Sequence, residues 1–162
     1  MVRAGIVPRI LESWRAPGRV ILSLRGMPDR VLIAVLMSAM LVFLIAQTPG
    51  HARAAQLDPS VPFQARIGGA LMAVMFILPL LAYAVAAAVA GLSRLTPWPV
   101  AARDSRLALF WALLAVAPAM LLAGLVEGLM GAGAALSLTR ALAGLGFVVI
   151  WGAGLRALAG QG

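Results

Sequence analysis

Cysteine and lysine are both missing from this chain of 162 residues, and histidine occurs once, as His51. Without cysteine the chain cannot form disulfides, thiolate metal sites or cysteine nucleophiles. Without lysine it lacks the side chain that tight phosphate loops and Schiff-base enzymes use. A single histidine cannot build a metal site, and the serines stand outside any nucleophile-elbow sequence. We therefore expect a protein that is not an enzyme and that binds no metal or cofactor.

Charge is scarce as well. Charged residues make up 11% of the chain, apolar residues 63%, and the mean hydropathy is +1.02. A soluble domain needs roughly a quarter of its residues charged in order to face water. No polar stretch is long enough to build a second core, so we expect one domain that faces lipid.

Four apolar runs predict an all-α fold, a polytopic membrane helix bundle. The runs cover residues 31–47, 67–92, 107–129 and 141–159. Each approaches or exceeds the roughly 20 residues that cross a hydrocarbon core of about 30 Å. The segments "TPGHARAAQLDPSVP", "SRLTPWPVAARDS" and "GAGA" contain the helix breakers and read as connections. We predict a transmembrane domain over residues 31–162, with re-entry of the glycine-rich fourth run as the alternative.

The basic residues are distributed unevenly along the chain. All 13 are arginine, and three of them (Arg53, Arg66 and Arg140) fall on one side of the predicted bundle while ten fall on the other. Positive charge stays in the cytoplasm, so we expect both termini on the cytoplasmic side of a bacterial inner membrane. A signal peptide ending at "HARAAQ" is the competing reading, but its leader and apolar run are both longer than such peptides have.

A basic leader over residues 1–30 precedes the first run. One set of apolar side chains recurs at helical spacing, apart from most of the arginines: Ile10, Leu11, Trp14, Val20, Ile21 and Leu24. Pro17–Gly18 breaks the segment in two. We predict an amphipathic interfacial segment that meets anionic headgroups through Arg9, Trp14, Arg15, Arg19 and Arg25. The alternative is that these arginines serve membrane topology alone.

Glu127 stands inside the third run, within "GLVEG" (Gly124–Gly128). An ionisable group at such a position is a functional-site hypothesis, and the two glycines are spaced for close approach of another helix. Arg140 begins the fourth run across a short link, so we predict an ion pair between Glu127 and Arg140 at the membrane boundary. Proton or substrate relay and plain solvation of Glu127 are the alternatives.

Small residues and prolines within the runs bear on packing. Alanines at four-residue spacing form possible ridges at Ala82, Ala86 and Ala90 and at Ala115, Ala119 and Ala123. Pro79 and Pro118 fall near the middle of their runs, and we expect both to kink their helices.

The order of elements resembles the Yip1-domain membrane proteins in their short bacterial form. The leader "ESWRAPGRVILSLRGMPDRVL", the closely spaced runs and the polar opening of "ARDSRLALFWALLAVAPAMLL" carry the likeness, which covers Leu11 to Leu155. Members of that family usually have five spans. Eukaryotic members interact with small GTPases and membrane-shaping partners in vesicle traffic, so the resemblance implies a non-enzymatic role in membrane organisation.

Three functions fit this reading. The first is a Yip1-like scaffold that acts through helix packing and contacts with anionic lipid and other membrane chains, with no nucleic-acid partner. The second is an accessory subunit of a larger respiratory or photosynthetic membrane complex. The third is a small transporter or channel component, which the near absence of polar groups from the second and third runs disfavours.

Overall fold

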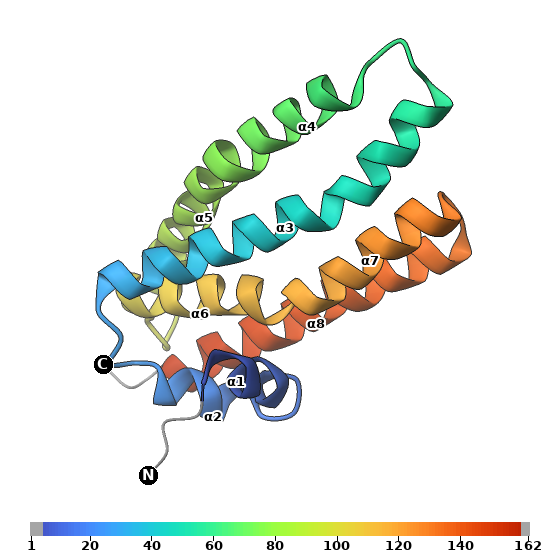
Figure 1. Cartoon of the computed structure of the whole chain (residues 1–162). Coiled ribbons are helices and arrows are strands. Elements are labelled where there is room, and N and C mark those ends of the chain that lie inside the picture. The colour runs from blue at the N-terminus through green and yellow to red at the C-terminus, as the bar shows by residue number, and fades with distance from the viewer. Residues whose placement is uncertain (1–4, 160–162) are drawn as a thin grey trace.

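The computed structural model describes residues 5–159, and every regular element in that range is a helix (Figure 1). Two short helices come first, α1 (Ile6–Ser13) and α2 (Pro17–Ser23). The elements that follow are α3 (Asp29–Leu57), α4 (Phe63–Met72), the π-helical segment η1 (Ala73–Ile77), α5 (Leu78–Ser93), α6 (Ala102–Ala115), α7 (Ala117–Met130) and α8 (Ala134–Leu158).

Within the described range, four helical stretches are long and apolar enough to cross a membrane: α3, the continuous α4–η1–α5, the pair α6–α7, and α8. The sequence-based prediction of an all-α, multi-pass membrane protein is therefore confirmed. The fourth run forms one unbroken helix of 25 residues, α8, so it is not a re-entrant loop. The glycines that weaken it in isolation are tolerated because a helix satisfies all of its own backbone hydrogen bonds in lipid.

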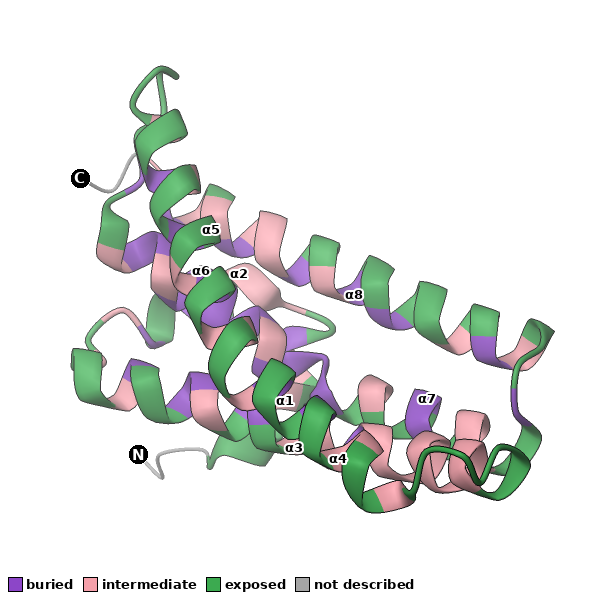
Figure 2. Cartoon of the chain, turned by 90° about the horizontal axis from the view of Figure 1, so that it is seen from above, coloured by how far each residue is buried: buried purple, intermediate pink, exposed green. Residues whose placement is uncertain are grey.

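The third stretch lies at the centre of the bundle. More than half of its most apolar window, 56%, is buried inside the protein, compared with 33% for α3, 22% for α8 and 17% for α4–η1–α5. Figure 2 shows the buried residues gathered along α6 and on the inner sides of its neighbours. The outer helices keep apolar side chains on their outer surface, as is usual in a membrane bundle, because those side chains face lipid. The helices of such a bundle are held together by packing and not by the expulsion of water.

The two ends of the bundle differ. We call one the arginine-rich end: it holds α1 and α2, the start of α3, residues 94–101 and the end of α8 (Figure 1). The opposite, loop end holds the connection over residues 58–62 and the link over residues 131–133. Each spanning helix therefore runs from one end to the other, antiparallel to its neighbour in sequence.

Every spanning helix is longer than its apolar run. The largest difference is in α3, which continues through Pro49 to Leu57, where the sequence predicts a connection after Gln47. An apolar run marks the part of a helix inside the hydrocarbon core, whereas the helix itself can continue into the headgroup layer. Close packing supports this extension, because a Cβ built on Gly128 of α7 would lie only 3.1 Å from the carbonyl carbon of Pro49.

Both mid-span prolines coincide with irregular backbone. The third stretch divides at Val116 into α6 and α7, two residues before Pro118. In the second stretch, η1 ends at Ile77, two residues before Pro79. Proline removes a backbone donor and crowds the preceding turn, and a π segment is one way to absorb that disruption.

The alanine ridge of α5 packs on α6. Ala82, Ala86 and Ala90 are its buried residues, and the buried hydroxyl of Ser105 donates to the Ala86 carbonyl at 2.8 Å. The small side chains let the two backbones approach closely enough for this interhelical hydrogen bond.

Candidate functional site

The leader is docked on the bundle through Ser13, which is completely buried. Its hydroxyl donates to the Arg9 carbonyl within α1 at 2.7 Å. The same oxygen accepts a hydrogen bond from the indole Nε1 of Trp111 on α6 at 2.9 Å. Both polar groups are thereby satisfied in a buried position, where an unpaired donor costs about 1–3 kcal/mol.

Trp14 makes a second connection from the leader. Its indole Nε1 donates to the Ala115 carbonyl at 3.0 Å, at the last residue of α6. The break at Val116 interrupts the regular helix there, and a side-chain donor from outside takes up one of the carbonyls beside the break. The break in the helix just before Pro118 thus coincides with the docking point of Trp14.

The indole of Trp14 reaches the level of the middle of the bundle. Ala115 lies about 20 Å along the helix from Ala102, at 1.5 Å per residue, in a stretch of 29 residues. On the other side of the indole is Gly146, near the midpoint of α8, where a Cβ would overlap the six-membered ring of Trp14. A glycine at position 146 is what admits this ring between α6 and α8.

The apolar face of α2 requires a correction. The sequence predicts that Val20, Ile21 and Leu24 sink into the headgroup layer, but they are 2%, 2% and 1% exposed inside the protein core. Helical periodicity identifies an apolar face without identifying what covers it, and here α6 and α8 cover it. The predicted insertion of these three apolar side chains into the headgroup layer is therefore wrong.

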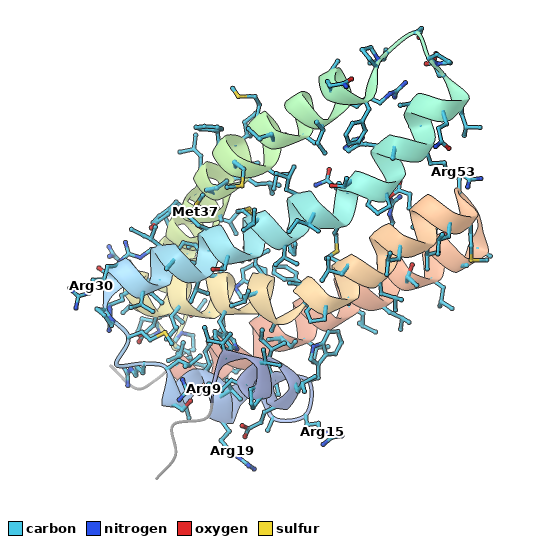
Figure 3. The ribbon with its side chains drawn as sticks, in the orientation of Figure 1. Arg9, Arg15, Arg19, Arg30, Met37 and Arg53 are labelled. Atoms are coloured by element: carbon cyan, nitrogen blue, oxygen red, sulfur yellow. The ribbon has the colours of Figure 1, made fainter. Side chains whose placement is uncertain are left out.

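The five residues predicted to meet lipid headgroups lie in three kinds of surroundings. Trp14 and Arg25 are engaged with the bundle, the latter through an ion pair with Asp104 at 3.2 Å. Arg15 and Arg19 are exposed and point away from the helices (Figure 3). Arg19 approaches Glu12 at 3.7 Å with 80% of its side chain exposed, a geometry that contributes little to stability. Arg9 is half-buried.

Asp104 anchors the leader to the start of α6. Its side chain is only 8% exposed and receives Arg25 at 3.2 Å. Asp104 and Ser105 lie in the first turn of α6 but do not cap it, because Ala101 holds the N-cap position without a side-chain hydrogen bond. The Arg25–Asp104 pair joins positions 79 residues apart, so no local pattern in the sequence could reveal it.

Arg103 holds the turn between α2 and α3. Its guanidinium lies 3.3 Å from Asp29 and donates to the carbonyls of Arg25, at 3.1 Å, and of Met27. Arg106 reaches the same Asp29 at 3.6 Å. One acid and two arginines thus fix the point where the leader turns into the first span.

The loop end brings Glu127 and Arg140 together. Arg140 Nη2 lies 2.9 Å from Glu127 Oε2, with the side chains 56% and 33% exposed. Arg53 of α3 (labelled in Figure 3) donates to the carbonyls of Gly128 and Leu129 at 3.3 and 3.2 Å. A cation at a helix C-terminus is favourable because the final carbonyls have no intrahelical donor. The sequence indicated the first contact but gave no signal for the second.

Asp58 ends α3 at the loop end, outside the spanning stretches. The hydroxyl and backbone N–H of Ser60 both donate to its carboxylate. These two hydrogen bonds, with the charge of Arg66 at 3.3 Å, hold the pKa of Asp58 below its usual value. The three residues close the connection between α3 and α4.

Replacing Glu127 by glutamine should change stability only modestly. The pair is partly exposed, and ion pairs of this kind contribute about 0.2–1 kcal/mol. We expect a small loss in thermal unfolding of the purified protein in detergent. The charge-swapped variant Glu127→Arg with Arg140→Glu should recover most of it. A large loss that the swap does not recover would contradict simple pairing of the two charges.

An apolar cleft lies between α5, α6 and α8. It has a volume of about 230 Å³. Its lining consists of Leu78, Leu81, Ala82, Val85, Leu109, Leu113, Phe147 and Trp151. In the part of the chain that the structure covers, no three histidine or acidic side chains gather where they could hold a metal ion.

No family model, curated protein or solved structure matches this chain. The length and hydropathy of the four spanning stretches define the class, which is a multi-pass membrane protein. The resemblance to Yip1-domain proteins therefore rests only on the order of the elements.

Proposed function

We propose that the chain is a non-enzymatic, Yip1-like scaffold of the bacterial inner membrane, with its arginine-rich end in the cytoplasm and in contact with anionic lipid. The observation that carries this proposal is the difference in how the arginines at the two ends are engaged. At the loop end, all three have partners: Arg53 binds carbonyl groups, Arg66 binds Asp58, and Arg140 binds Glu127.

The arginine-rich end has more arginine than its own acids can engage. Nine of its described arginines face three acids, Glu12, Asp29 and Asp104, and all three acids already have arginine partners. Within residues 5–159, five arginine side chains at this end make no hydrogen bond or ion pair: Arg9, Arg15, Arg30, Arg94 and Arg156. Such a surface suits the anionic cytoplasmic leaflet, at about 1 kcal/mol for each arginine near the headgroups.

The test compares lipid composition around three versions of the whole protein. Wild type, extracted in polymer-bounded membrane discs, should carry more anionic phospholipid than the bulk membrane. Replacing Arg9, Arg15 and Arg19 by glutamine should lower that enrichment several-fold, because three charges are lost. Replacing the same three by lysine should preserve it, since the positive charge remains.

Two outcomes would count against the proposal. If wild type carries the bulk composition, the basic surface does not select lipid. If the glutamine and lysine variants behave alike, charge is not the cause.

The second candidate function, an accessory subunit, is favoured by the outer position of α4–η1–α5, of which only 17% is buried. Co-migration of the extracted protein with a much larger assembly would support that role instead.

A further inference from the structure

Arg156 occupies an unusual position at the arginine-rich end of α8. Its side chain is exposed and has no partner in the described part of the chain. It lies between two hollows of the surface. One, of about 230 Å³, is shared with Trp98 and Ala159. The other, of about 540 Å³, extends along α8 over Val148, Val149, Gly152 and Ala153.

All the residues that line the second hollow belong to α8, so it is a shallow groove along one open face of that helix. A Cβ built on Gly152 would meet no atom within 4 Å, so the space beside this glycine is open. Val148 and Val149 are exposed by 59% and 54% and form the far part of the floor. From Val148 to Arg156 the groove runs about 12 Å along the helix, at 1.5 Å per residue. Its floor is apolar throughout, and its single charge stands at one end.

The depth of this groove matches one leaflet. With the midpoint of α8 near Gly146 at the membrane centre, Arg156 lies about 15 Å away, at 1.5 Å per residue. Half of a hydrocarbon core of about 30 Å is the same distance. With the bilayer placed in this way, Arg156 stands at the headgroup boundary and Val148 lies near the centre. Trp98, 69% exposed beside Arg156, has the amphipathic side chain that is enriched at this level.

We propose that α8 binds one anionic phospholipid, whose phosphate meets Arg156 beside Trp98 and whose acyl chain lies in the groove over Gly152. A guanidinium binds phosphate oxygens through charge-assisted hydrogen bonds, and an apolar groove of this length accommodates the chain attached to that phosphate. This inference rests on the proposed function only in that both take anionic lipid as the partner.

A second copy of the chain is a poorer occupant. To satisfy Arg156 it would have to supply a carboxylate at the same level of the membrane. The described acids at the arginine-rich end are Glu12, Asp29 and Asp104, and each is already paired with an arginine of its own chain. Charge complementarity therefore favours lipid phosphate over another copy.

The experiment uses the full chain, purified in detergent and stripped of lipid, then titrated with phosphatidylglycerol and examined by native mass spectrometry. Wild type should retain one phosphatidylglycerol more tightly than phosphatidylcholine. Arg156→Gln should weaken that affinity roughly ten- to a hundredfold, the effect of losing a hydrogen bond to a charged group. Arg94→Gln is the matched control, because Arg94 is also unpartnered at this end but does not line the groove.

Gly152→Leu tests the groove separately from the charge. The new side chain would fill open space without meeting the rest of the protein, so folding should be preserved while the lipid is lost. Gly91→Leu is its control, since Gly91 near the end of α5 also has nothing within 4 Å of a built Cβ. Excess inorganic phosphate should leave the lipid bound, because it cannot occupy the groove.

Several results would overturn this site. Equal weakening by Arg156→Gln and Arg94→Gln would show diffuse attraction by the basic surface. Displacement of the lipid by inorganic phosphate would show a plain anion site. A change of oligomeric size in Gly152→Leu with lipid retention intact would show that another chain covers the groove. The last case is a difference between variants. If the Arg9, Arg15 and Arg19 variant loses its lipid enrichment while Arg156→Gln still binds phosphatidylglycerol like wild type, the proposed function stands and this site is rejected.

Discussion

Gly124→Ala is expected to lower the free energy of unfolding by about 3 kcal/mol or more, the upper range for overpacking. A Cβ at position 124 of α7 would overlap the carbonyl oxygen of Ala46 on α3 and lie 2.7 Å from its carbon. The obstacle is backbone rather than a flexible side chain, so α3 and α7 must move apart. Their contact includes Pro49 and Gly128 one turn further along, and it would loosen there too.

Gly144→Ala provides the matched control for this experiment. Gly144 lies in α8, and a Cβ there would meet nothing within 4 Å. Alanine is also the better helix former by about 1 kcal/mol, so this variant should be as stable as wild type or slightly more so. Thermal unfolding in one detergent, read by circular dichroism, compares the two. Equal midpoints for both variants would contradict close packing of α3 on α7.

Trp14→Ala should release the leader from the bundle. The change removes the ring between α6 and α8 and the hydrogen bond to Ala115. Because 44% of Trp14 is exposed, we expect a loss of about 2 kcal/mol, below the 3–5 kcal/mol of a fully buried tryptophan. Trp14→Phe loses the N–H donor and the outer part of the indole that lies against Gly146 but keeps an aromatic ring, so it should cost about 1 kcal/mol or more and less than Trp14→Ala.

The absence of native cysteine makes this release measurable. A single cysteine at Val20, which is 2% exposed, should react slowly with a maleimide in otherwise wild-type protein. Adding Trp14→Ala should raise its rate roughly tenfold or more, since each 1.4 kcal/mol of easier opening multiplies the open fraction by ten. Leu11→Ala is the control, because Leu11 also lies in α1 but is 64% exposed. Equal acceleration by both changes would mean that Trp14 does not hold the leader.

Some features of this protein follow from the sequence alone. The number of spanning helices follows from apolar runs, because the bilayer thickness sets the length that a helix must have. The irregular backbone at η1 and Val116 follows from Pro79 and Pro118, because proline disrupts a helix wherever it stands inside one. The proximity of Glu127 and Arg140 follows from a short link between antiparallel helices. Each of these depends on local chemistry or on the uniform environment of the membrane.

Other features were decided only by the tertiary structure. Val20, Ile21 and Leu24 form an apolar face that lipid or protein could cover equally well, and periodicity does not distinguish the two. The docking of Trp14 on Ala115 and of Arg25 on Asp104 joins residues 101 and 79 positions apart. Such contacts exist because three-dimensional packing brings the helix break at Val116, Gly146 of α8 and the buried carboxylate of Asp104 within reach of the leader. That packing is a property of the whole bundle, and no short stretch of sequence contains it.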